Sequence, residues 1–62
     1  MEQLRTQTDA ALVSTVQLGR TLFETCLFFT DGGSEVVERY VYADHAVQGH
    51  QEWADLMEQV PG

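Results

Sequence analysis

The sequence predicts an α+β fold, in which a three-stranded antiparallel β-meander is followed by one C-terminal amphipathic helix. Between residues 12 and 42, apolar and polar residues alternate in three runs rich in β-branched and aromatic side chains, which is typical of half-buried strands. After residue 44 the period changes, and apolar residues recur at steps of three and four, as in a helix. The predicted order is therefore β-β-β-α.

The three predicted strands are joined by short connections that contain glycine. Residues 12–18 alternate cleanly, and the Gly-Arg-Thr connector at 19–21 suits a hairpin. Residues 22–30, LFETCLFFT, form the most β-prone run of the chain. The Asp-Gly-Gly-Ser segment at 31–34 is a strong turn signal, because glycine adopts positive φ without steric cost. Residues 35–42, EVVERYVY, form the third predicted strand.

The predicted helix begins at Asp44, whose carboxylate suits an N-cap, and ends before the Pro61-Gly62 breaker pair. Gly49 in its interior costs up to about 1 kcal/mol relative to alanine, which indicates a close approach to the sheet. The acidic residues Glu52, Asp55 and Glu58 lie toward the opposite face. The apolar face is predicted to hold Ala46, Val47, His50, Ala54, Met57 and Val60.

Sixty-two residues make one small domain, which we place at residues 11–62 after a flexible or briefly helical lead-in at residues 1–10. A chain this short buries only about 60% of its unfolded surface, so its own core is marginal. Cys26 is the single cysteine and cannot form an intrachain disulfide. We therefore expect stabilisation by oligomerisation or by docking onto a partner. No secretory signal or membrane-spanning run is visible, so we expect the protein in the cytoplasm.

Ten carboxylates stand against three arginines and no lysine, and the excess is concentrated in residues 31–62, where Arg39 is the only cation. A field of one sign favours a basic protein partner and disfavours direct binding to nucleic acid or to anionic membranes. Trp53 lies beside the acidic helix face and is a candidate anchor, since tryptophan is enriched in interface hot spots. A solvated face without a partner is the alternative. The predicted acidic binding face comprises Asp31, Glu35, Glu38, Asp44, Glu52, Asp55, Glu58 and Trp53.

The second predicted strand is apolar on both faces, although one helix covers only one face of a sheet. Leu22, Cys26 and Phe28 point one way, and Phe23, Leu27 and Phe29 point the other way. We expect Leu22, Cys26 and Phe28 to form an exposed patch, joined by Val13 or by Val37 and Val41, depending on register. A second copy of the chain, a host protein or a folded-over N-terminal segment could cover this patch, and we favour a homodimer.

No constellation typical of catalysis or metal binding appears. His45 and His50 are five residues apart, whereas two histidines on one helix face bind zinc at a spacing of four. We expect His50 to be a core-edge residue hydrogen-bonded to the sheet, and His45 to be exposed. Glu35 and Glu38 are expected on opposite faces of their strand, which would not make a carboxylate pair. The sequence therefore predicts no enzyme activity, no cofactor and no metal site.

Four segments resemble a group of short uncharacterised proteins of actinobacterial phages and prophages. These are VSTVQLG at 13–19, LFETCLFF at 22–29, ERYVY at 38–42 and HAVQGHQEW at 45–53. The resemblance covers about two-thirds of the chain. This chain departs from the group at Gln17, where the relatives carry Trp, and in its first connector, which is shorter than theirs. The resemblance implies a phage origin and the β-β-β-α fold, but no activity.

Small acidic phage proteins often inhibit a host protein machine by binding it, as anti-CRISPR proteins and DNA mimics do. We therefore expect an inhibitor that binds a basic surface, such as that of a nucleic-acid-binding complex, through electrostatic and apolar contacts. The alternative is a structural or regulatory homodimerisation module without an inhibitory role.

Overall fold

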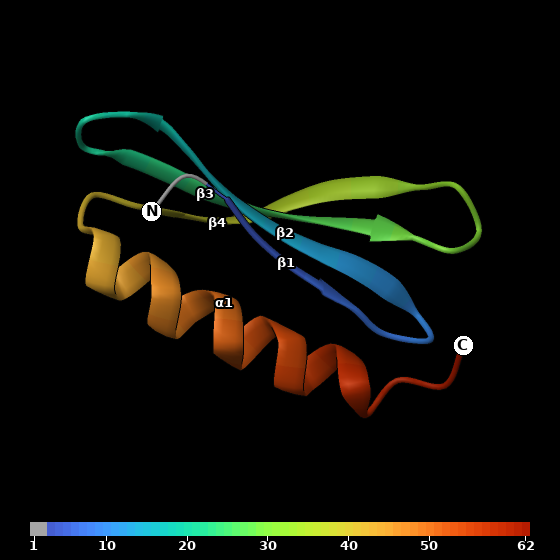
Figure 1. Cartoon of the computed structure of the whole chain (residues 1–62). Coiled ribbons are helices and arrows are strands. Elements are labelled where there is room, and N and C mark those ends of the chain that lie inside the picture. Colours follow the sequence, from blue (N-terminus) through green and yellow to red (C-terminus); the bar gives the residue numbers. More distant parts are fainter. Residues whose placement is uncertain (1–2) are drawn as a thin grey trace.

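The computed structural model describes residues 3–62 and contains a four-stranded antiparallel sheet with one C-terminal helix (Figure 1). The strands are neighbours in chain order, so the sheet is a simple meander. The predicted α+β class and the meander followed by a helix are confirmed, but the predicted number of strands was wrong. The elements are β1 (Gln3–Gln7), β2 (Ala11–Gly19), β3 (Leu22–Phe29), β4 (Ser34–Tyr40) and α1 (Ala43–Glu58).

The additional strand, β1, comes from the segment expected to be a lead-in. Leu4 pairs with Thr15 and Thr6 pairs with Val13, so the segment extends the edge of the sheet instead of folding over its face. Leu4 and Thr6 are half-buried while their neighbours are exposed. That alternation is a strand pattern, but a single apolar residue made it too weak to recognise in the sequence. Residues 1 and 2 of the expected lead-in lie outside the described residues.

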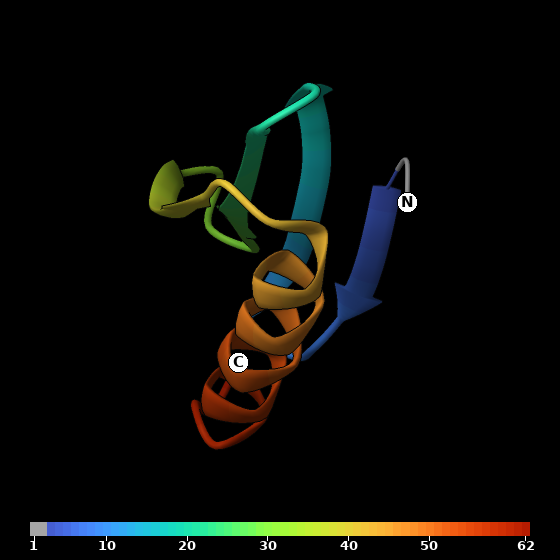
Figure 2. The same cartoon turned by 90° about the vertical axis from the view of Figure 1, so that its left-hand side faces the viewer.

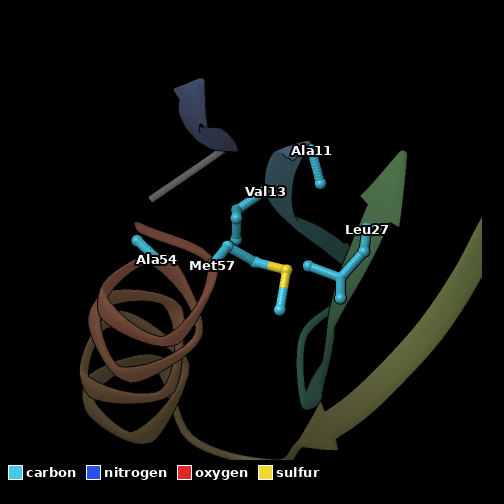
Figure 3. Packing of buried hydrophobic residues seen from close by; sticks show 5 residues of the cluster. All are labelled: Ala11, Val13, Leu27, Ala54 and Met57. Carbon is cyan, nitrogen blue, oxygen red and sulfur yellow. The ribbon is translucent and has the colours of Figure 1, made fainter. Parts of the chain in front are cut away.

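The main core lies between α1 and one face of β2 and β3 (Figure 2). Met57 reaches from the helix toward Val13 and Leu27, and Ala11 and Ala54 complete the cluster (Figure 3). A second cluster, made by Phe23, Tyr40 and Ala46, lies under the first half of the helix. The alternating pattern of β3 places Phe23 and Leu27 on the helix side of the sheet, as the sequence predicts.

The N-cap of the helix lies two residues earlier than expected. Tyr42 occupies the N-cap without a side-chain capping hydrogen bond, so the expectation that Asp44 caps the helix was wrong. β4 ends at Tyr40, two residues earlier than predicted, and the chain enters the helix before it reaches Asp44. The Asp44 carboxylate lies instead in the first turn, where it accepts a hydrogen bond from the His45 backbone N–H at 3.0 Å. A negative charge is favourable there because of the helix dipole.

A bulge in β4 changes which residues share a face. Cys26 of β3 pairs with Val36, whereas Thr25 pairs with Glu38, so Val37 is an extra residue. Leu27, which faces the helix, pairs with Glu35, so Glu35 and Glu38 both lie on the helix side. The expectation that these two carboxylates occupy opposite faces was therefore wrong. The alternation of a strand sequence does not reveal where an extra residue interrupts it.

Candidate functional site

The exposed side of α1 carries only negative charge. Glu52, Asp55 and Glu58 are all exposed, and the helix contains no lysine or arginine. Two glutamines hold the first two carboxylates in place: Gln48 donates to Glu52 at 3.4 Å, and Gln51 donates to Asp55 at 2.9 Å. The helix therefore presents ordered carboxylates at a spacing of three residues.

The single cation of residues 31–62 is paired with a carboxylate of the neighbouring strand. Arg39 donates through Nε to Glu24 at 3.2 Å, and the two residues are direct cross-strand partners in β4 and β3. Glu24 also pairs with Val16, which belongs to the sheet face opposite the helix. Side-chain neutralisation of the helix carboxylates by Arg39 is thereby reduced, because its guanidinium is already paired with Glu24.

Glu38 is the strand carboxylate that contacts the helix. Its Oε1 accepts hydrogen bonds from the indole N–H of Trp53 at 2.9 Å and from the Tyr40 hydroxyl at 3.1 Å. Trp53 packs half-buried against the main core, so its indole is held rigidly. These contacts bring the predicted anchor and a predicted carboxylate together.

A groove of about 410 Å³ lies beside this contact, between the end of β4 and the first half of α1. The charged residues Glu38, Arg39 and Glu52 line it together with the rings of Tyr40, Tyr42 and His45. Tyr42 is 62% exposed, and the His45 ring meets it edge-on at a centroid distance of 5.4 Å. Burial is the largest cause that raises the pKa of Tyr40 above its usual value of 10.0. The hydrogen bond from Thr25 opposes this rise in pKa, whereas the hydrogen bond to Glu38 and the charges of Glu38 and Glu52 add to it. The two carboxylates outnumber the lining cation Arg39, so the groove is negative on balance.

The groove is supported from inside by a chain of buried hydrogen bonds that crosses the whole sheet. His50 is 5% exposed, and its Nδ1 and Nε2 lie 2.7 Å from Thr15 Oγ1 and 2.9 Å from Thr6 Oγ1. The chain continues from Thr15 to Thr25 at 2.6 Å and from Thr25 to the Tyr40 hydroxyl at 3.1 Å. In the described residues, no buried side-chain nitrogen or oxygen lacks a hydrogen-bond partner.

The carboxylate of Glu38 fixes the direction of every hydrogen bond in this chain. An ionised carboxylate only accepts, so the Tyr40 hydroxyl donates its single proton to Glu38 and must accept from Thr25. By the same argument, Thr15 donates to Thr25 and accepts from His50 Nδ1–H. Neutral His50 then accepts at Nε2 from the Thr6 hydroxyl. The expectation that His50 is hydrogen-bonded to the sheet is confirmed, whereas its two threonine partners, Thr6 and Thr15, were not foreseen.

The sheet face opposite α1 carries an apolar patch without a covering element in the described part of the chain. Leu22 and Phe28 are 42% and 47% exposed, and Cys26 is half-buried between them, on the face that the sequence predicts. Two of the expected additions to this patch, Val13 and Val37, were wrong, because both pack on the helix side. Val13 is fully buried under the helix, and because of the bulge it is Val36 that pairs with Cys26. Leu12 of β2 joins the patch opposite Phe28.

The predicted acidic residues do not form one continuous site. Asp31 lies in the β3–β4 turn, where its carboxylate accepts from the Gly33 backbone N–H at 3.1 Å, and Glu35 lies at the start of β4. Asp44 lies at the beginning of α1. The structure therefore concentrates the candidate site on Glu38, Trp53 and the helix carboxylates.

The two histidines have separate environments, since His45 is exposed and His50 is buried with both ring nitrogens engaged. Within residues 3–62 there is no group of three or more histidine, cysteine or acidic side chains arranged to hold a metal ion. No helix of that same range has both the length and the apolar character required to cross a membrane.

Comparison with protein-family models, with curated proteins and with solved structures found no match. The functional inference for this chain therefore rests on its own residues.

Proposed function

We propose that this protein is a small acidic inhibitor that acts by binding a basic surface of a host protein machine, such as the nucleic-acid groove of a CRISPR or other defence complex in the host cytoplasm. The observation that carries the proposal is the array of Glu52, Asp55 and Glu58 on a helix without any cation. The proposed role is binding without catalysis. Electrostatic attraction would speed the encounter, and aromatic and apolar contacts would hold the complex.

The spacing of the helix carboxylates supports mimicry of a nucleic acid. Residues three apart on an α-helix are separated by about 4.5 Å along its axis. One strand of DNA carries one phosphate charge per about 3.4 Å of axis. A row formed by Glu52, Asp55 and Glu58 therefore has a charge density comparable to that of a single nucleic-acid strand.

Helix stability does not account for these charges. Asp55 and Glu58 lie toward the C-terminal end of α1, where the helix dipole disfavours negative charge. Like charges three residues apart also repel each other by a few tenths of a kcal/mol. These carboxylates weaken the helix, so their presence is better explained by a partner whose positive charges neutralise them.

A capture experiment at two salt concentrations tests the proposal. The immobilised protein is expected to retain a basic nucleic-acid-binding protein from an actinobacterial lysate at low salt, and duplex DNA is expected to release it by competition. With the captured protein purified, the double variant Asp55→Asn/Glu58→Gln should bind more weakly than wild type. The control Asp9→Asn/Asp31→Asn removes the same charge outside the helix, and asparagine at position 31 keeps an acceptor for the Gly33 backbone N–H, so this variant should bind nearly as well. Equal affinity at low and high salt would refute the mimicry.

A second candidate function, homodimerisation, is favoured by the position of the apolar patch. Leu22, Cys26, Phe28 and Val36 lie on the sheet face opposite the acidic helix. Two copies packed through these faces would bury the patch and keep the two acidic helices far apart, which minimises repulsion between them. The two functions are compatible, since such a dimer would display an acidic helix on each outer side.

Analytical ultracentrifugation of matched variants tests the dimer. Phe28→Asp is expected to yield a monomer, whereas Leu56→Asp should leave the dimer intact. The two side chains are equally exposed, at 47%, and both changes add one negative charge. A monomeric wild-type protein at high micromolar concentration would exclude this role.

A further inference from the structure

We infer that the groove between the end of β4 and α1 is a receptor for an arginine side chain on the surface of the basic partner. This inference rests on the proposed function and deepens it, because it names the point at which one partner residue is held. The groove is lined by carboxylates on two sides, Glu38 from the strand and Glu52 from the helix, with the ring of Tyr42 beside them.

The groove is built before any partner arrives. Gly49 lines its floor, and the absence of a side chain there leaves room for the Tyr40 ring, which a Cβ at this position would overlap. The Tyr40 hydroxyl and the Trp53 indole both donate to Glu38 Oε1. Glu38 therefore has a fixed orientation, and the described residues form no hydrogen bond with its other oxygen. A preorganised carboxylate binds more tightly than a mobile one, because less side-chain entropy is lost.

The chemistry of the lining favours arginine over other occupants. The two carboxylates outnumber the lining cation Arg39, so the groove favours a positively charged side chain over an acidic or purely apolar one. A guanidinium forms directional hydrogen bonds to carboxylates and stacks on aromatic rings, whereas the ammonium of lysine is more strongly hydrated and does not stack. Tyr42 supplies an exposed ring, held edge-on by His45. The internal cation at the rim, Arg39, is already paired with Glu24 on the other side of the sheet.

An NMR titration of the full chain tests the inference with the tripeptide Ac-Gly-Arg-Gly-NH₂ as probe. We expect shift changes that saturate at the Trp53 indole N–H and at the backbone amides of Tyr42 and Gly49. The peptide in which citrulline, a neutral isostere, replaces arginine should produce none of them. The lysine peptide should bind more weakly than the arginine peptide.

Matched variants distinguish binding of the arginine peptide in the groove from its general electrostatic attraction to the acidic helix. Glu52→Gln and Glu38→Gln should each weaken binding roughly fivefold, and Tyr42→Ala roughly threefold. Glu38→Gln keeps an acceptor for Trp53 and Tyr40, and Glu52 is an exposed helix position, so the fold should be retained. Asp55→Asn removes the same charge one turn away from Glu52 and should have little effect. An equal loss with Asp55→Asn, or equal binding of the citrulline peptide, would overturn the inference.

The outcomes distinguish this inference from the proposed function. If the tripeptide does not bind but Asp55→Asn/Glu58→Gln weakens binding to the host protein, the groove inference fails and the proposed function stands. If the tripeptide binds in the groove but host-protein binding is insensitive to salt and to that double variant, the proposed function fails and the arginine receptor stands.

Discussion

The ring of Tyr40 occupies the space into which a side chain at position 49 would project, so α1 approaches β4 closely only because residue 49 is glycine. Gly49→Ala should therefore destabilise the protein by about 1–3 kcal/mol through overpacking, although alanine has a helix propensity about 1 kcal/mol better than that of glycine. Urea unfolding measures the change.

The same substitution in a Tyr40→Leu background serves as the control. Tyr40→Leu removes the hydroxyl and the ring carbons that the added methyl group would overlap. The cost of Gly49→Ala should be smaller there. A Gly49→Ala protein more stable than wild type would show that helix propensity outweighs the close contact.

The hydrogen-bond chain that ends at Glu38 predicts the tautomer of His50. Because each hydroxyl donates in the direction of the carboxylate, neutral His50 should carry its proton on Nδ1. This is the less common tautomer of free histidine. The ¹⁵N shifts and ring couplings of His50 at pH 8 distinguish the two forms, with exposed His45 as an internal reference. A proton on Nε2 would show that the chain runs in the other direction.

Acidification should destabilise the fold through His50. Burial lowers the pKa of His50 in the folded protein below its usual value of 6.5. Between the lowered pKa and 6.5, the unfolded state binds more protons than the folded state, so stability falls as the pH falls through this window. The stability that neutral His50 contributes is fully present above pH 6.5. It is lost as the pH falls to the folded-state pKa and does not change further below that pKa.

Urea unfolding between pH 5 and pH 8 measures this dependence. His50→Gln should be less stable at pH 8 and should lose much of the pH dependence in that window. His45→Gln, at an exposed position, should retain the wild-type profile. If His45→Gln instead abolished the dependence of stability on pH, the effect would come from His45 and the prediction for His50 would be wrong.

Thr25 is the central link of the buried chain, and Thr25→Val should be strongly destabilising. Valine has the same shape but leaves the Thr15 hydroxyl without its acceptor and the Tyr40 oxygen without its donor. Leaving a buried polar group unsatisfied costs about 1–3 kcal/mol. Thr21→Val, in the exposed β2–β3 turn, should change stability by less than about 0.5 kcal/mol. Thermal unfolding of both variants tests this difference in stability. Similar melting temperatures for the two variants would refute a stabilising role for the buried hydrogen bonds of Thr25.

The sequence by itself determined the elements whose pattern is strong. The alternation in β3 placed Phe23 and Leu27 on one face and Phe28 on the other, and Gly49 indicated a close contact between helix and sheet. These features follow from local periodicity, which is fixed by backbone geometry alone. The acidic character of the helix could likewise be read directly from Glu52, Asp55 and Glu58.

Only the tertiary structure decided the features that do not follow from the periodicity of the sequence. β1 exists because its backbone hydrogen-bonds to β2, although its side chains give little signal. Glu38 lies on the helix side with Tyr40, where Trp53 and Tyr40 donate hydrogen bonds to it, and the bulge at Val37 places Glu35 on the same side. The threonines that satisfy His50 come from two strands, and the groove forms only where β4 and α1 meet. The strand register, the hydrogen-bond partners of buried side chains and the shape of the groove all arise from the packing of one element against another. They therefore depend on residues that are distant in the sequence.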